Sequence, residues 1–126
     1  YDPRVRSRIE AGATMTAADY VALTAARCRI IAAMDALTAP FDALLMPTCP
    51  IVAPRIAELA EDAEYYRLNA LLLRNPSLGN FLDRCAISLP CNRPGEAPVG
   101  LMLMGETGGD ASLFAVAAAV EAALAA

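Results

Sequence analysis

The sequence contains no lysine and no histidine, and all ten of its basic residues are arginines. Ser–His, Cys–His and Ser–Lys catalytic pairs each require one of the two missing side chains to accept a proton. We therefore expect no catalytic residue in this chain. The serines that we interpret as structural or surface residues are Ser7, Ser77, Ser88 and Ser112.

Metal-binding and cofactor-binding motifs are also missing. The four cysteines form no C-x-x-C pair, and there is no histidine to complete a zinc site. Neither G-x-G-x-x-G nor G-K-S/T occurs, so Gly108 and Gly109 do not indicate a phosphate loop. We expect no metal and no cofactor, and we interpret the cysteines as single buried thiols. A redox protein that uses these thiols is an alternative. The cysteines are Cys28, Cys49, Cys85 and Cys91.

Positive charge and long apolar runs are scarce as well. The net charge is −4 and the isoelectric point is about 4.7, which argues against a nucleic-acid surface. No uncharged run approaches the roughly 18 residues of a membrane helix, and no basic and apolar leader follows Tyr1. We therefore expect no nucleic-acid partner, no membrane insertion and a cytoplasmic location.

Apolar residues, in contrast, are in excess, at 57% without counting glycine. Ordinary globular chains reach about 45–50% with glycine included. A domain of 126 residues has too much surface to cover this composition comfortably. We expect part of the apolar surface to pack against polypeptide outside this chain. The alternative is a free-standing, non-enzymatic module that uses an apolar face to form a homo-oligomer or to dock on a partner.

Helix-start signals mark the first half of the chain. Asp2 followed by Pro3 predicts a short first helix. Thr16 and Asp19 form a T-x-x-D cap ahead of a long helix over residues 17–38. Both helices should therefore begin where these caps lie.

The second half of the chain alternates helices and strands. Residues 57–73 have a helical pattern, which breaks after 74–76, and Asp110 should cap a last helix. Short apolar runs bounded by proline predict the strands, the last two as a hairpin or neighbouring pair. The fold class is therefore α/β. The predicted strands are residues 43–46, 86–89 and 99–104.

One arginine interrupts the apolar stripe of the long helix. The predicted stripe consists of Tyr20, Leu23, Arg27, Ile30, Met34 and Leu37. A guanidinium in such a stripe must reach water or meet an anion, because burying it alone costs several kcal/mol. Arg27 therefore either extends to solvent or a structural carboxylate, or binds a substrate anion.

The order of these segments resembles the C-terminal part of amidase signature family hydrolases, the Ser–Ser–Lys amidases. The matching stretches cover almost the whole chain in the right order. They are YDPRVRSRIEAG, DYVALTAARCRI, FDALLMPTCPIVAP, NFLDRCAISLP and PVGLMLMGETGGDASLFAVAAAVEAAL.

The resemblance implies a mixed sheet flanked by helices and an enzyme that hydrolyses a small-molecule carboxamide. It also implies that the catalytic Ser, the bridging Ser and the Lys belong to an earlier portion of the protein. Residues 1–126 would then be the C-terminal segment of an amidase domain, supplying scaffold and part of the substrate pocket, inactive without the N-terminal portion.

Two residues are substrate-binding candidates by resemblance. Arg27, seven residues after Tyr20, corresponds to an arginine that can hold a substrate carboxylate in relatives acting on glutamine-like substrates. Asn80 resembles the family's asparagine in the loop before a core strand, where it either fixes loop backbone or touches substrate. Leu73 stands where amidotransferase subunits carry a glutamine-binding Asp, which argues against a glutaminase.

The segment 84–86 reads Arg-Cys-Ala where many relatives read Gly-Leu-Pro. We expect Asp83 and Arg84 to pair with each other or with the missing portion, and we assign neither a catalytic role.

Overall fold

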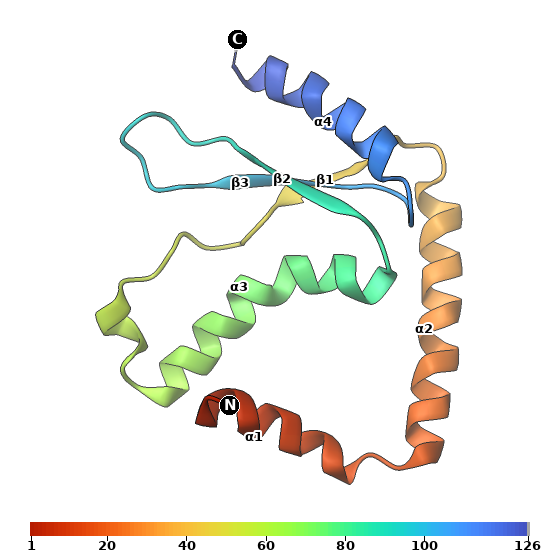
Figure 1. The fold of residues 1–126 in the computed structure, drawn as a ribbon, viewed down its shortest axis with the longest axis vertical. Helices are drawn as coiled ribbons and strands as arrows, with labels where there is room; N and C mark the ends of the chain where they lie inside the picture. The colour runs from red at the N-terminus through yellow and green to blue at the C-terminus, as the bar shows by residue number, and fades with distance from the viewer. Residues whose placement is uncertain (126) are drawn as a thin grey trace.

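A computed structural model of the chain describes residues 1–125. Within these residues the fold consists of four α-helices, three strands and two short 3-10 helices (Figure 1). The α-helices are α1 (Pro3–Glu10), α2 (Ala17–Thr38), α3 (Asp62–Leu82) and α4 (Asp110–Leu124). The strands are β1 (Leu44–Pro47), β2 (Ala86–Pro90) and β3 (Gly100–Met104), and the 3-10 helices are η1 (Ala11–Thr14) and η2 (Ile56–Leu59).

The three strands form one sheet in the order β1-β3-β2, and both pairings are antiparallel. Met104 of β3 lies opposite Leu44 of β1 and opposite Ala86 of β2. The predicted α/β class and the neighbouring pair formed by the last two strands are confirmed. The mixed sheet implied by the resemblance is represented, in residues 1–125, by antiparallel strands alone.

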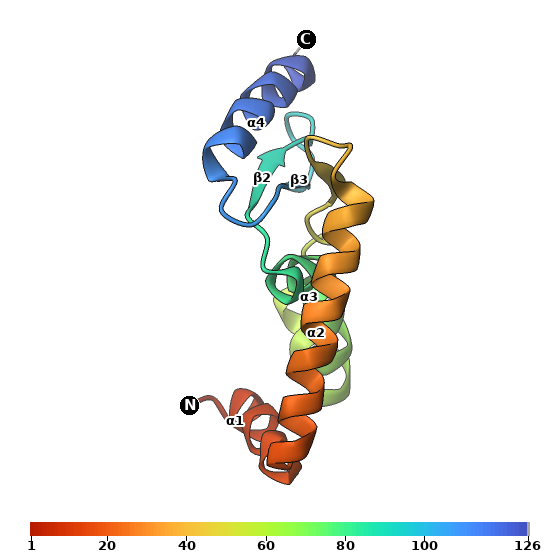
Figure 2. The ribbon, with the colours of Figure 1, turned by 90° about the vertical axis from the view of Figure 1, so that its right-hand side faces the viewer.

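Helices cover both faces of the sheet (Figures 1 and 2). α4 packs on one face, where Leu113 joins Leu103 of the central strand in the core. The C-terminal end of α3 lies against the other face, and a methyl group at Gly79 would be 3.4 Å from Cε of Met104. Leu103 and Met104 are completely buried, so the core is centred on β3.

α1 lies far from the sheet and is attached to the start of α3 (Figure 1). Nε of Arg4 donates a 2.7 Å hydrogen bond to Oδ1 of Asp62, and its guanidinium lies 4.2 Å from the ring centre of Tyr65. The hydrogen bond to Asp62 raises the pKa of Arg4. A charge pair and a cation–π contact thus hold α1, an otherwise exposed helix, against the start of α3.

The caps predicted for the first two helices are present. Asp2 accepts from the amide of Arg4, and Thr16 and Asp19 form a complete capping box at the start of α2. α4 begins differently, because Asp110 is already its first helical residue and no side chain caps it. The predicted Asp110 cap is therefore wrong. Among residues 1–125, no helix is both long and apolar enough to cross a membrane.

α3 continues through the point where we predicted a break. Pro76 lies inside the helix, and the chain remains helical to Leu82, where Asp83 adopts a left-handed conformation with φ of 60°. Proline removes the single hydrogen bond to the carbonyl of Leu72, and the bend of α3 is visible in Figure 1. Packing of Gly79 and Leu82 beneath the sheet compensates for this local loss.

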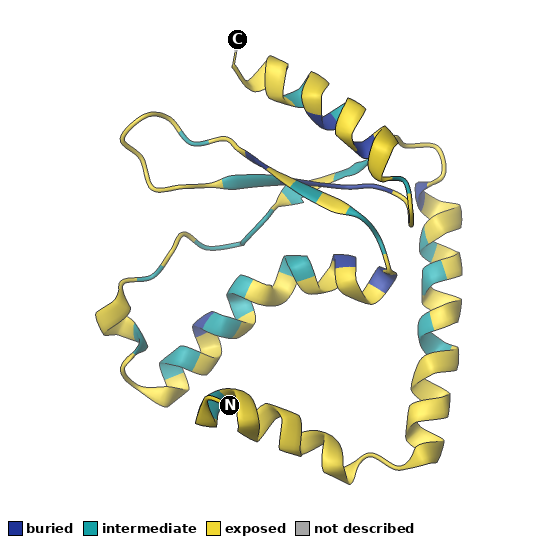
Figure 3. Ribbon diagram, in the orientation of Figure 1, coloured by how far each residue is buried: buried dark blue, intermediate teal, exposed yellow. Residues whose placement is uncertain are grey.

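The stripe predicted for α2 is only partly covered within this chain. Most of α2 is exposed (Figure 3), and its exposed apolar side chains include Tyr20, Leu23, Ile30 and Leu37. The covered side keeps Arg27 and Met34 of the predicted stripe and adds Ile31 and Thr38. An apolar face of α2 is therefore left without a partner among the described residues.

Candidate functional site

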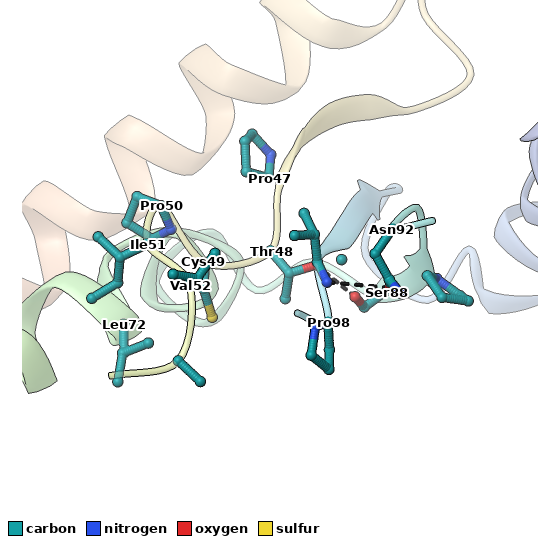
Figure 4. Close-up of a pocket in the computed structure, with 14 residues that line it drawn as sticks. Pro47, Thr48, Cys49, Pro50, Ile51, Val52, Leu72, Ser88, Asn92 and Pro98 are labelled. Atoms are coloured by element: carbon teal, nitrogen blue, oxygen red, sulfur yellow. Dashed lines mark hydrogen bonds between the residues drawn. The ribbon is translucent and has the colours of Figure 1, made fainter. Parts of the chain in front are cut away.

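A cavity lies at the end of the sheet away from α4's first turn. Its volume is about 640 Å³, within the range of small-molecule sites. The loop after β1, the connection between β2 and β3, and one residue of α3 form its walls (Figure 4). The lining residues are Pro47, Thr48, Cys49, Pro50, Ile51, Val52, Ala53, Leu72, Ser88, Pro90, Asn92, Pro98, Val99 and Gly100.

Hydrogen bonds with β3 and with α3 hold the loop after β1 in place. The amide of Thr48 donates a 2.8 Å bond to the carbonyl of Gly100, which extends the β1–β3 ladder beyond the strand. Nδ2 of Asn75 donates a 2.7 Å bond to the carbonyl of Pro47, which ties the loop to α3. The wall of the pocket is therefore attached to the sheet and to a helix.

Two hydroxyl groups meet inside the pocket. Oγ1 of Thr48 and Oγ of Ser88 lie 2.5 Å apart and come from segments forty residues distant (Figure 4). Gly100 makes this meeting possible, since a methyl group there would lie 2.6 Å from Oγ1 of Thr48 and closer still to Ser88. This contact is the one hydrogen bond that joins two side chains of the lining, and Oδ1 of Asn92 accepts a 3.3 Å bond from the amide of Val99.

Apart from Asn92, the rest of the lining is apolar, and it carries no Asp, Glu or Arg side chain. Proline rings and aliphatic side chains predominate, and Cys49 contributes a half-buried thiol. A metal ion or a charged ligand would find no opposite charge in this lining. No cluster of metal-ligating side chains occurs anywhere in residues 1–125.

Arg27 and Asn80 lie side by side at the C-terminal end of α3. Nε of Arg27 donates a 2.7 Å bond to the carbonyl of Phe81, and Nη2 donates a 3.3 Å bond to the carbonyl of Asn80. Nη2 is also 3.7 Å from Oδ1 of Asp83. A cation at a helix C-terminus complements the helix dipole and binds carbonyls that have no intrahelical partner.

This geometry differs from the sequence-based picture of Asn80. The residue lies in the last turn of α3 and not in a loop before a strand, because α3 is longer than predicted. Its main-chain carbonyl, rather than its side chain, binds Arg27. Neither Arg27 nor Asn80 lines the 640 Å³ pocket.

Asp83 and Arg84 do not pair with each other in the structure. The Arg84 side chain is only 2% exposed and donates from Nη2 to Asp35 at 2.5 Å and to Thr38 at 2.8 Å. Asp83 instead faces Arg27. Two arginines thus hold the C-terminal ends of α2 and α3.

All four cysteines in the described part of the chain are free. Cys85 donates to the carbonyl of Glu106 at 3.0 Å, and Cys49 is half-buried. Cys28 and Cys91 are exposed, so the prediction of buried thiols is wrong for these two.

Sequence reasoning missed Thr48, Asn75 and Gly100 as site residues. The prolines on either side of Thr48 were the available signal, because they mark an irregular loop directly after a buried strand. No local pattern links that loop to Ser88 or Gly100, since their contact depends on strand order.

Comparison with known proteins gives consistent results. The family model described as Amidase matches residues 1–114. The chain is 32% identical over 122 residues to a 2-amino-5-chloromuconic acid deaminase of Comamonas testosteroni, covering 96% of this chain and 26% of that protein. It is 35% identical over 111 residues to a fatty acid amide hydrolase of Oryza sativa subsp. indica, covering 86% and 18%.

A solved structure of a Kluyveromyces lactis allophanate hydrolase variant superposes with a TM-score of 0.78 at 27% identity. The match covers 89% of this chain and 18% of that one. The chain therefore spans about a quarter or less of the length of these relatives.

Proposed function

The chain belongs to the amidase signature family, and we propose that it is the C-terminal scaffold and substrate-pocket portion of an enzyme that hydrolyses a carboxamide. The observation that carries the proposal is the family match over residues 1–114 in a chain that spans only 26% of the first relative. The intact protein is this chain joined to the catalytic portion that we propose to precede it.

The chemistry is assigned to the intact protein. A serine of the catalytic portion attacks the amide carbon and forms an ester. Ammonia or an amine leaves with a proton that a lysine delivers through a bridging serine, and water then hydrolyses the ester to the acid. The absence of lysine and histidine from the 126 residues supports this division of labour.

Unpartnered apolar surface also supports the proposal. On α2 the exposed side includes Ile30 and Leu37, and on the edge strand β1 Leu45 is exposed. The outer edges of β1 and β2 have no strand partner within residues 1–125. The catalytic portion would cover this face of α2 and extend the sheet. Four free thiols are compatible with the cytoplasmic location that we propose.

Arg27 and Asn80 remain part of the proposal as substrate-binding residues. Nε and Nη2 of Arg27 bind the end of α3, and within residues 1–125 no acceptor is recorded for Nη1. Nη1 is therefore the group that would bind a substrate carboxylate, beside the exposed side chain of Asn80.

Ammonia release from simple carboxamides tests the assignment. The intact protein should hydrolyse at least one amide of a panel that contains propionamide, hexanamide and succinamate. The isolated 126-residue chain should release no ammonia at the same concentration. Turnover by the isolated chain would overturn the division of labour, and an inactive intact protein would overturn the enzymatic assignment.

A non-enzymatic dimerisation or docking module is the second candidate, favoured by the same exposed apolar residues. Analytical ultracentrifugation of the isolated chain separates the two. A monodisperse homodimer supports the module, whereas aggregation that the co-expressed catalytic portion prevents supports the enzyme.

A further inference from the structure

We propose that the pocket around Thr48 and Ser88 binds an uncharged, apolar group of the amide substrate, and that the hydroxyl pair donates a hydrogen bond to an oxygen atom of that group. This inference rests on the proposed function and specifies the substrate class. It concerns residues that are separate from Arg27 and Asn80, which line no part of this pocket.

The walls of the pocket select against charge. Ile51, Val52, Leu72 and Val99 present aliphatic side chains, and proline rings fill much of the remaining lining. A carboxylate or ammonium group that entered would lose water without gaining an opposite charge, which is unfavourable. An alkyl or aryl group would instead remove its own apolar surface and that of the walls from water.

The hydroxyl pair gives the pocket a polar contact of defined direction. Each hydroxyl carries one hydrogen, and in the 2.5 Å contact one of the two hydrogens is used between them. The other remains available for a ligand oxygen. Thr48, Ser88 and Gly100 all line the pocket, and because Gly100 has no Cβ beside the two hydroxyls, a carbonyl oxygen can approach them.

Cys49 provides a binding readout that does not depend on catalysis. Its thiol lines the pocket, whereas Cys28 lies exposed on α2 outside it. The intact protein is treated with iodoacetamide, and mass spectrometry follows alkylation of each cysteine. Hexanamide should slow alkylation of Cys49 at least fivefold and leave the rate at Cys28 unchanged. Adipamate, which has the same chain length with a terminal carboxylate, should need at least tenfold higher concentration for equal protection.

Substitutions of lining residues test whether hexanamide binds in this pocket. Val52 is 57% exposed, so a polar side chain is tolerated there without disturbing the core. Val52→Asp should raise the hexanamide concentration needed for protection at least tenfold, whereas Val52→Leu should leave it within twofold. Ser88→Ala should weaken protection about 3- to 10-fold, the range of one neutral hydrogen bond.

The outcomes separate this inference from the proposed function. Equal protection by hexanamide and adipamate, or none by either, overturns the inference even if the intact protein releases ammonia. Protection of Cys49 that Val52→Asp abolishes supports the pocket assignment even if no amide is hydrolysed, and in that case the enzymatic proposal is the one that fails.

Discussion

Nη2 of Arg84 lies 2.5 Å from Oδ1 of Asp35 and joins the start of β2 to the last turns of α2. The arginine side chain is 2% exposed and the aspartate 52%, so the pair sits at the boundary between core and solvent. The same Nη2 binds the hydroxyl of Thr38, the buried polar residue at the end of α2. This contact ties the C-terminal end of α2 to the segment that precedes β2.

Replacing Arg84 with methionine should destabilise the intact protein by about 2 kcal/mol. The loss stays below that of a fully buried pair because Asp35 can be rehydrated and because Nε of Arg84 already has no acceptor among the described residues. Urea denaturation followed by circular dichroism measures the change. Arg67→Met, which removes an exposed pair with Glu64, is the control and should change stability little.

Gly100→Ala should destabilise the protein by about 1–3 kcal/mol, since the new methyl group would collide with both hydroxyls of the pocket. Gly12→Ala is the matched control, because no atom lies within 4 Å of a methyl group at that position. Thermal unfolding of the two variants compares them directly. Equal melting temperatures would contradict the close approach that the structure shows.

The capping box of α2 should make its N-terminus sensitive to acid. Hydrogen bonds from the hydroxyl and the amide of Thr16 lower the pKa of Asp19 below its ordinary value of 3.8. The stabilisation is therefore complete above pH 3.8 and is lost as the pH falls through the lower pKa of the folded state. Thr16→Val should raise the pKa of Asp19 toward 3.8 in an NMR titration. Thr14→Val, outside the box, should leave it unchanged.

Arg27→Met should raise the KM of the intact protein for succinamate about tenfold and leave the KM for propionamide unchanged, if Nη1 binds a substrate carboxylate. Arg27→Lys retains the charge without the guanidinium geometry and should give an intermediate KM. Steady-state kinetics with both amides distinguish this role from a structural one. A similar change for both substrates would show that the arginine acts only through the end of α3.

Local signals explain which parts of the fold could be predicted from sequence. The caps at Asp2 and at Thr16 act within one helical turn, so the starts of α1 and α2 were found. The path of α3 beyond Pro76 depends on packing of Gly79 under β3, which no local pattern reports. The same limit applies to Thr38, whose burial depends on Arg84 from a distant segment.

The candidate site was harder to predict than the fold. Arg27 was singled out because a charge interrupts an apolar stripe, and the structure shows why the interruption is tolerated: the guanidinium reaches the carbonyls of α3. The pocket itself joins Thr48, Leu72 and Ser88, which come from three separate segments. The antiparallel register of the sheet brings Thr48 and Ser88 together, and the position of α3 beside the loop after β1 adds Leu72.

The position of β3 between β1 and β2 affects how the chain folds as it leaves the ribosome. Neither earlier strand has its partner in this chain until Gly100–Met104 has been synthesised. Until then two short apolar strands expose open edges, which favour association between nascent chains. Ribosome-bound chains that stop before Gly100 should therefore recruit chaperones more strongly than chains that extend past α4.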